Sequence, residues 1–177
     1  MAKRQADIAL EFDIVGVGVA DLHVRLGQAE TILSGICYGR DAFGDLMRMA
    51  LVLSTGGAGA ECLFEREPDL WRVVVGRQNL QPDQIAITVY DLSQAAADGL
   101  GASGPLHFEG TCPADDFVAA INREAERLLQ SYDLASYQSA WHWPFPMKAF
   151  KALQAARAVS GPTVAHGGPP PELPPWH

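Results

Sequence analysis

The chain has 177 residues, of which 48% are hydrophobic and 19% charged, and its formal net charge is −8. This hydrophobic share is typical of a folded domain and argues against a mostly disordered chain. The acidic balance disfavours nonspecific binding to nucleic acid, and no stretch approaches the ~20 apolar residues of a membrane span. The N-terminus also lacks the apolar core of a signal peptide, so we expect a cytoplasmic protein with neither a nucleic-acid nor a membrane partner.

The first part of the chain predicts strands. Apolar and polar residues alternate over residues 8–14 and again over 22–26. A period of two is typical of strands that bury one face, so two or three antiparallel strands are expected before Cys37. Asp41 is the predicted N-cap of a short amphipathic helix, which the glycines from Gly56 onward should end.

The central part predicts more strands. Residues 61–66 and 71–77 are two strand-like runs, and the Pro and Asp of residues 67–70 suit the turn of a hairpin. Residues 84–92 and 105–111 supply two further strands, separated by a loop rich in Ala, Gly and Ser. These runs predict a sheet that grows as a meander.

The clearest predicted helix begins at Asp115 and Asp116, and another is expected over residues 147–158. Strands separated mainly by turns, with helices late in the chain, indicate an α+β fold. We expect a largely antiparallel meander sheet with two or three amphipathic helices packed on it. Residues 1–160 are predicted to form a single domain.

The C-terminal stretch, residues 161–177, contains six prolines and three glycines. Such a composition buries too little apolar surface to order itself, so a disordered tail is predicted. Residues 169–176, Pro-Pro-Pro-Glu-Leu-Pro-Pro-Trp, also suit a polyproline ligand for a groove on a partner.

No motif of catalysis is recognisable in the sequence. Gly16 and Gly18 begin like a dinucleotide loop, but Asp21 replaces the third glycine, and a strand-like run follows. The histidines lack the spacing of a metal site, and no serine lies in a Gly-x-Ser-x-Gly elbow. We therefore predict no catalytic residues, cofactor or metal. Three cysteines, Cys37, Cys62 and Cys112, fit buried reduced thiols.

Two segments rich in aromatic residues are candidates for binding a partner, and the first of them is also rich in charge. One is the predicted hairpin with Glu65, Glu67, Asp69 and Trp71, and the other is the aromatic segment, residues 141–146, which begins with Trp141 and His142. Aromatic residues are enriched among interface hot spots. A packing role remains open for both segments, because Trp and Pro also build rigid cores. The six candidates are Glu65, Glu67, Asp69, Trp71, Trp141 and His142.

The sequence contains four motifs in a fixed order, which are Phe64-Glu65-x-Glu67-Pro68-x-x-Trp71, Ile85-x-Ile87-x-Val89-x-Asp91, Phe117-x-x-x-Ile121 and Trp141-x-x-Pro144-Phe145-Pro146. This order, over about residues 30–155, resembles a family of small, mostly uncharacterised bacterial α+β proteins. Some similar proteins are treated as candidate immunity proteins of toxin systems. The resemblance implies a single α+β domain and brings no catalytic residues with it.

The leading functional hypothesis is a non-enzymatic protein-binding domain, immunity-like, whose partner is a basic protein. The alternative is an enzyme or small-ligand-binding protein with a site assembled from distant residues, for which the polar candidates are Asp91, His107, Tyr137 and His142. A homodimer formed through a sheet edge or a helix face is a third hypothesis and does not exclude the first.

Overall fold

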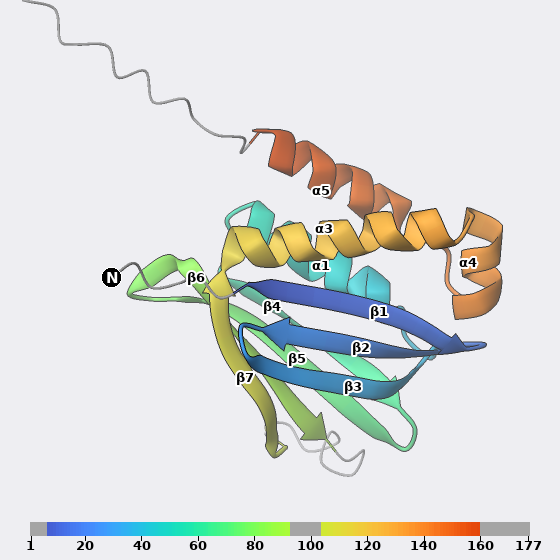
Figure 1. Ribbon diagram of the computed structural model, residues 1–177. Coiled ribbons are helices and arrows are strands. Elements are labelled where there is room, and N and C mark those ends of the chain that lie inside the picture. Colours follow the sequence, from blue (N-terminus) through green and yellow to red (C-terminus); the bar gives the residue numbers. More distant parts are fainter. Residues whose placement is uncertain (1–6, 93–103, 160–177) are drawn as a thin grey trace, which may run out of the picture.

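A computed structural model of the chain describes residues 7–92 and 104–159 (Figure 1). The elements follow the sequence in the order β1 (Ile8–Gly16), β2 (Val19–Leu26), β3 (Ala29–Cys37), α1 (Ala42–Ser54), β4 (Gly59–Arg66), β5 (Asp69–Gln78), β6 (Gln81–Leu92), β7 (Leu106–Pro113), α3 (Ala114–Ser131), α4 (Leu134–Trp141) and α5 (Met147–Val159). The predicted tail, residues 161–177, lies outside the described residues.

The strands form two antiparallel sheets, β1-β2-β3 and β4-β5-β6-β7. Each sheet is a meander, and the predicted α+β class with antiparallel pairing is confirmed. We expected a single sheet, but the strands form two. Helix α1 lies between β3 and β4 in the chain, so β3 ends the first sheet and β4 begins the second. Figure 1 shows α1 and α3 covering the two sheets on one side, with α5 outside them.

Buried and more exposed side chains alternate along the strands, because one face of each sheet lies against the core. In β1 the side chains of Ile8 and Phe12 are buried while Glu11 between them is exposed, and in β5 Val73 and Val75 are buried. One continuous cluster of buried hydrophobic residues joins both sheets to the helices. Burial of this apolar surface is the main term that stabilises such a fold.

The helix predicted after Asp41 is confirmed as α1, and the Asp41 carboxylate accepts a hydrogen bond from Gly44 N at 3.0 Å. Helix α1 is buried on several sides, because sheet, α3 and α5 all pack against it. Helix α4 is an element that sequence periodicity did not predict. It begins at the N-cap Asp133, and at its end His142 adopts the left-handed conformation with φ of 71°.

All three cysteines are free. Cys62 and Cys112 are buried, as predicted, and Cys37 is half-buried. Burial raises the pKa of both buried thiols, that of Cys112 to about 12. The thiolate is the reactive form, so these two side chains serve as small core residues. Across the described ranges, every helix is too short or too polar to cross a membrane.

Candidate functional site

Trp71 on β5 is a core residue, because its side chain is only 3% exposed. Its indole N–H donates to the carbonyl of Ser34 on β3 at 3.2 Å. The Arg66 guanidinium lies 4.2 Å from the centre of the indole, and the His107 ring lies 4.6 Å from it. The expectation that Trp71 is a surface anchor for a partner is therefore corrected: its N–H is satisfied across the two sheets, and its apolar faces are covered.

A β-bulge places His107 over Trp71. Val89 on β6 pairs with Phe108, and the next pair is Tyr90 with Leu106, so His107 is the extra residue on β7. A bulge redirects one side chain, and here it brings the imidazole within 2.9 Å of Thr31 Oγ1 on β3. His107 thereby links the two sheets.

Trp141 is also buried, with no exposed side-chain area. Its ring packs edge-on against Phe12, with centroids 5.1 Å apart, and its N–H lies 3.4 Å from Asp41 Oδ1. The first ring of the aromatic segment is thus a packing anchor for α4 against β1, and it is not available to a partner at the surface.

The next residues of the aromatic segment are exposed. The His142 ring packs against Tyr38, with centroids 4.7 Å apart, and the Trp143 N–H donates to the Tyr38 carbonyl at 2.6 Å. Tyr38 is 52% exposed and Trp143 is 37% exposed. The sequence analysis selected His142 and included Trp143 within the candidate segment 141–146, but it missed Tyr38. An aromatic residue in the short connection between a strand and the N-cap Asp41 was the available signal.

Gly18, in the turn between β1 and β2, packs directly against the rings of Tyr38 and His142. Its N–H donates to the Ala140 carbonyl at 2.7 Å, and it has a positive φ of 69°. A Cβ built on Gly18 would lie 2.4 Å from the Tyr38 ring and 2.8 Å from the His142 ring. The neighbouring Val17 is 72% exposed. The turn, the residues after β3 and the end of α4 therefore form one apolar surface.

One of the predicted acidic residues, Glu65, contacts the loop at residues 38–41, which borders this surface. Glu65 pairs with Arg40 at 3.3 Å, and Gly39 packs directly beneath the Glu65 carboxylate. Glu67, at the turn of the β4–β5 hairpin, is exposed and enters no ion pair with another described residue. We call this region the 38–41 surface, and it consists of Val17, Tyr38, Arg40, Glu65, His142 and Trp143.

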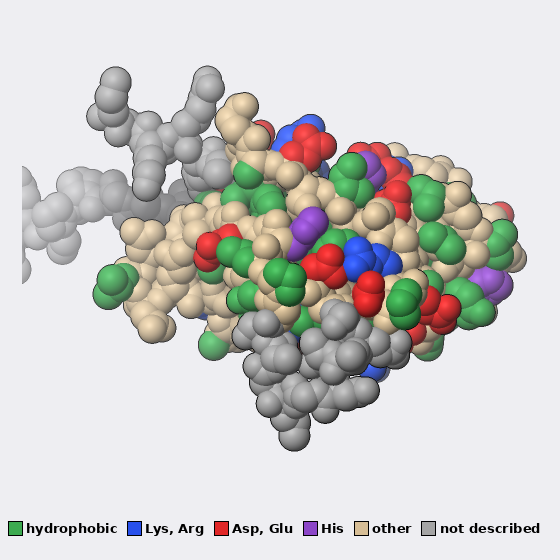
Figure 2. Space-filling model, turned by 90° about the horizontal axis from the view of Figure 1, so that it is seen from below, with side chains coloured by type: hydrophobic (Ala, Val, Ile, Leu, Met, Phe, Trp, Pro, Cys, Tyr) green, Lys and Arg blue, Asp and Glu red, His purple; other side chains and the backbone are tan. Residues whose placement is uncertain are grey.

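Asp69 lies at the side of the same hairpin. Arg66 binds Asp91 at 2.7 Å and Asp69 at 3.6 Å, so part of the acidic charge is neutralised within the chain. Viewed from the side of the sheets, acidic and basic side chains lie next to one another among hydrophobic ones (Figure 2). The structure thus places Glu65 and His142 at the 38–41 surface, Glu67 at the exposed turn of the β4–β5 hairpin, and Asp69 in an ion pair with Arg66.

A groove of about 590 Å³ lies next to the 38–41 surface, between α1 and α5. We call it the α1–α5 groove. It is lined by Asp41, Arg48, Leu51, Trp143, Pro144, Phe145, Pro146, Met147, Lys148, Ala149 and Ala152. Burial raises the pKa of Asp41, although the hydrogen bonds from Gly44 and Trp141 oppose that shift. A concave, mostly apolar surface with few polar groups is typical of a binding site.

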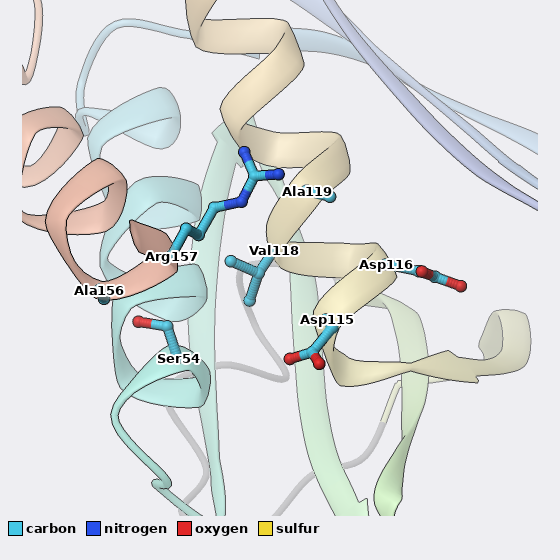
Figure 3. A pocket seen from close by; sticks show the side chains of 7 residues that line it. All are labelled: Ser54, Asp115, Asp116, Val118, Ala119, Ala156 and Arg157. Carbon is cyan, nitrogen blue, oxygen red and sulfur yellow. The ribbon is translucent and has the colours of Figure 1, made fainter. Parts of the chain in front are cut away.

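A second hollow, of about 320 Å³, lies at the opposite end of α1, where α1, α3 and α5 meet. Asp115 faces this space, Arg157 extends from α5 toward α3, and Asp116 points away to the other side of α3 (Figure 3). The Ser54 hydroxyl donates to the Leu51 carbonyl at 2.9 Å. The lining residues therefore offer two carboxylates and one guanidinium, and the one hydroxyl among them is bound to a backbone carbonyl.

The four polar residues considered for an assembled catalytic or ligand site make their contacts at three separate places. Asp91 and His107 lie on either side of the Arg66–Trp71 pair. Tyr137 is buried against Phe145, and burial raises the pKa of its hydroxyl. His142 lies on the 38–41 surface. Within the described ranges, no group of three or more His, Cys, Asp or Glu side chains could hold a metal ion.

Comparisons with protein-family models, with curated proteins and with solved structures found no match to this chain. The resemblance to small, mostly uncharacterised bacterial α+β proteins therefore stays a prediction.

Proposed function

We propose that this protein is a non-enzymatic protein-binding domain and that its partner binds the 38–41 surface. The observation that carries the proposal is the exposed pair Tyr38 and Trp143: the Trp143 indole N–H donates to the Tyr38 backbone carbonyl at 2.6 Å, and the Tyr38 ring packs against His142. Trp, Tyr and Arg are the residue types most enriched among interface hot spots, and fixed side chains lose little entropy on binding.

The partner in this proposal is a basic protein. The net charge of −8 supports it, as does Glu67, whose exposed carboxylate lies at the turn of the hairpin that carries Glu65. Complementary charge raises association rates and is screened by salt. An immunity-like role, in which the basic partner is a toxin, is the form of this function that the sequence resemblance suggests.

The test is isolation of the tagged full chain from its own cells at low salt, with co-purifying proteins identified and quantified. We expect one basic protein at a fixed ratio, retained at low salt and released as the salt concentration rises. A double variant, Tyr38→Ser with Trp143→Ser, should reduce its recovery at least tenfold, and Glu67→Lys should slow its association.

Two control variants make the comparison specific. Leu80→Ser removes an apolar side chain that is 97% exposed at the β5–β6 turn, and Glu30→Lys reverses an exposed charge at the β2–β3 turn. Both variants should capture the same amount of partner as the unaltered chain does. Equal capture by all variants with an intact fold would refute this surface, and a bound small molecule with no protein partner would favour the enzyme or ligand-binding alternative.

A further inference from the structure

The α1–α5 groove is suited to an extended apolar segment. Apart from Asp41, Arg48 and Lys148, its lining side chains are apolar, and Trp143 and Phe145 contribute aromatic rings. Grooves lined by aromatic residues bind Pro-rich segments, because a polyproline II helix is already extended and has little conformational entropy to lose. The groove therefore favours a ligand that is rich in proline and carries few charges.

This same chain contains such a segment. Residues 169–176 read Pro-Pro-Pro-Glu-Leu-Pro-Pro-Trp and carry a single charged side chain, Glu172. We propose that residues 169–176 bind in the α1–α5 groove of their own chain. The proposal is independent of the partner proposed for the 38–41 surface, although Trp143 belongs to both places.

The length of the chain after α5 fits this arrangement. The groove lies along the first turns of α5, and the helix ends at Val159. Thirteen helical residues span about 20 Å at 1.5 Å per residue. Residues 160–168 span up to about 28 Å at 3.1 Å per extended residue. The connection is thus long enough to run back along α5 and bring residue 169 to the groove.

Charge supplies the second argument. Lys148 lines the groove, is exposed, and enters no ion pair with another residue in the described part of the chain. Arg48, the other cation of the groove, pairs with Asp45. Lys148 is therefore the cation that can pair with Glu172 when the segment lies in the groove.

The test uses the full chain with 5-fluorotryptophan in place of tryptophan and observes the fluorine resonance of each indole by NMR. The Trp176→Phe variant assigns the Trp176 resonance. We expect this resonance to differ from that of a synthetic peptide of residues 161–177 and to keep its position on dilution. Lys148→Glu should shift it toward the position in the free peptide, and Glu172→Lys should do the same.

The double charge reversal, Lys148→Glu with Glu172→Lys, should restore the original position of the Trp176 resonance. Lys151→Glu is the matched control, because this exposed lysine lies on the same helix and does not line the groove, and it should leave the resonance in place. The proposal would be overturned if the Trp176 resonance had the same position as in the free peptide, or if Lys148→Glu left its position unchanged. A position that changes on dilution would assign the groove to a second copy and overturn the intramolecular form.

Discussion

The backbone N–H of Phe12, on the edge strand β1, donates to the buried carboxylate of Glu124 on α3 at 2.6 Å. Arg127, one turn further along α3, donates to the Phe12 carbonyl at 3.1 Å, and Arg123 donates to the Ile8 carbonyl at 3.3 Å. Helix α3 therefore satisfies backbone groups that a neighbouring strand would otherwise bind. An edge covered in this way is protected from pairing with another chain.

Glu124→Ala should lower the free energy of unfolding by about 2–3 kcal/mol, because it leaves the buried Phe12 N–H without an acceptor. Glu124→Gln should lose less, since its amide oxygen can still accept that bond. Urea unfolding measures both changes. Gln130→Ala, an exposed position on the same helix, is the control and should change stability by less than about 0.5 kcal/mol. A loss for Glu124→Ala no larger than the control would contradict this role.

Arg77→Ala should lower the free energy of unfolding by about 2 kcal/mol, because its guanidinium binds three carbonyl groups. The bonds run to Leu53 at 2.7 Å, Gly57 at 3.0 Å and Pro82 at 2.6 Å, and they connect β5 to the end of α1 and to the start of β6. Hydrogen exchange should show the largest loss of protection in the last turn of α1. Arg25→Ala, at an exposed position on β2, should leave that protection unchanged.

Gly18→Ala should lower the free energy of unfolding by about 1–2 kcal/mol from backbone strain at its positive φ alone. The added methyl group would also displace the Tyr38 and His142 rings. The nuclear Overhauser contacts of these two rings in the variant should therefore differ from those in the unaltered chain. Gly16→Ala is the matched control in the same turn, because its nearest neighbour would be Val19 Cβ at 3.8 Å. Equal losses in the two variants would show that the rings do not depend on Gly18.

Two N-cap aspartates should give opposite pH dependences of stability. Burial raises the pKa of Asp41 above 3.8, so the folded state binds this proton more tightly, and stability falls as pH rises from 3.8 through the folded value. Hydrogen bonds from Ser136 lower the pKa of Asp133, so its contribution is complete above 3.8 and is lost as pH falls through the folded value.

The measurement is the difference in free energy of unfolding between the unaltered chain and each Asn variant across the acidic range. Asn keeps an acceptor at an N-cap and removes the titration. The difference for Asp41→Asn should decrease with rising pH, and the difference for Asp133→Asn should increase. Slopes of the same sign would contradict the opposite environments of the two carboxylates.

Local patterns in the sequence determined the strands, the start of α1 and the α+β class, because alternation and capping act between residues close in the chain. The short helix α4 escaped prediction because its eight residues carry only two buried side chains, Tyr137 and Trp141. A run of eight residues is too short for a helical period to be recognised in the sequence.

Only the tertiary structure decided which aromatic residues are buried and which are exposed. Trp71 finds its acceptor 37 residues away at Ser34, and Trp141 finds Asp41 at a separation of 100 residues, so both indoles can leave water with their N–H groups satisfied. Trp143 binds the Tyr38 carbonyl across 105 residues and stays partly exposed. The sequence alone determined that acidic residues are concentrated in the predicted hairpin and aromatic rings in residues 141–146. Folding decided that the loop at residues 38–41 joins them, because such contacts depend on the packing of α4 against the turn between β1 and β2.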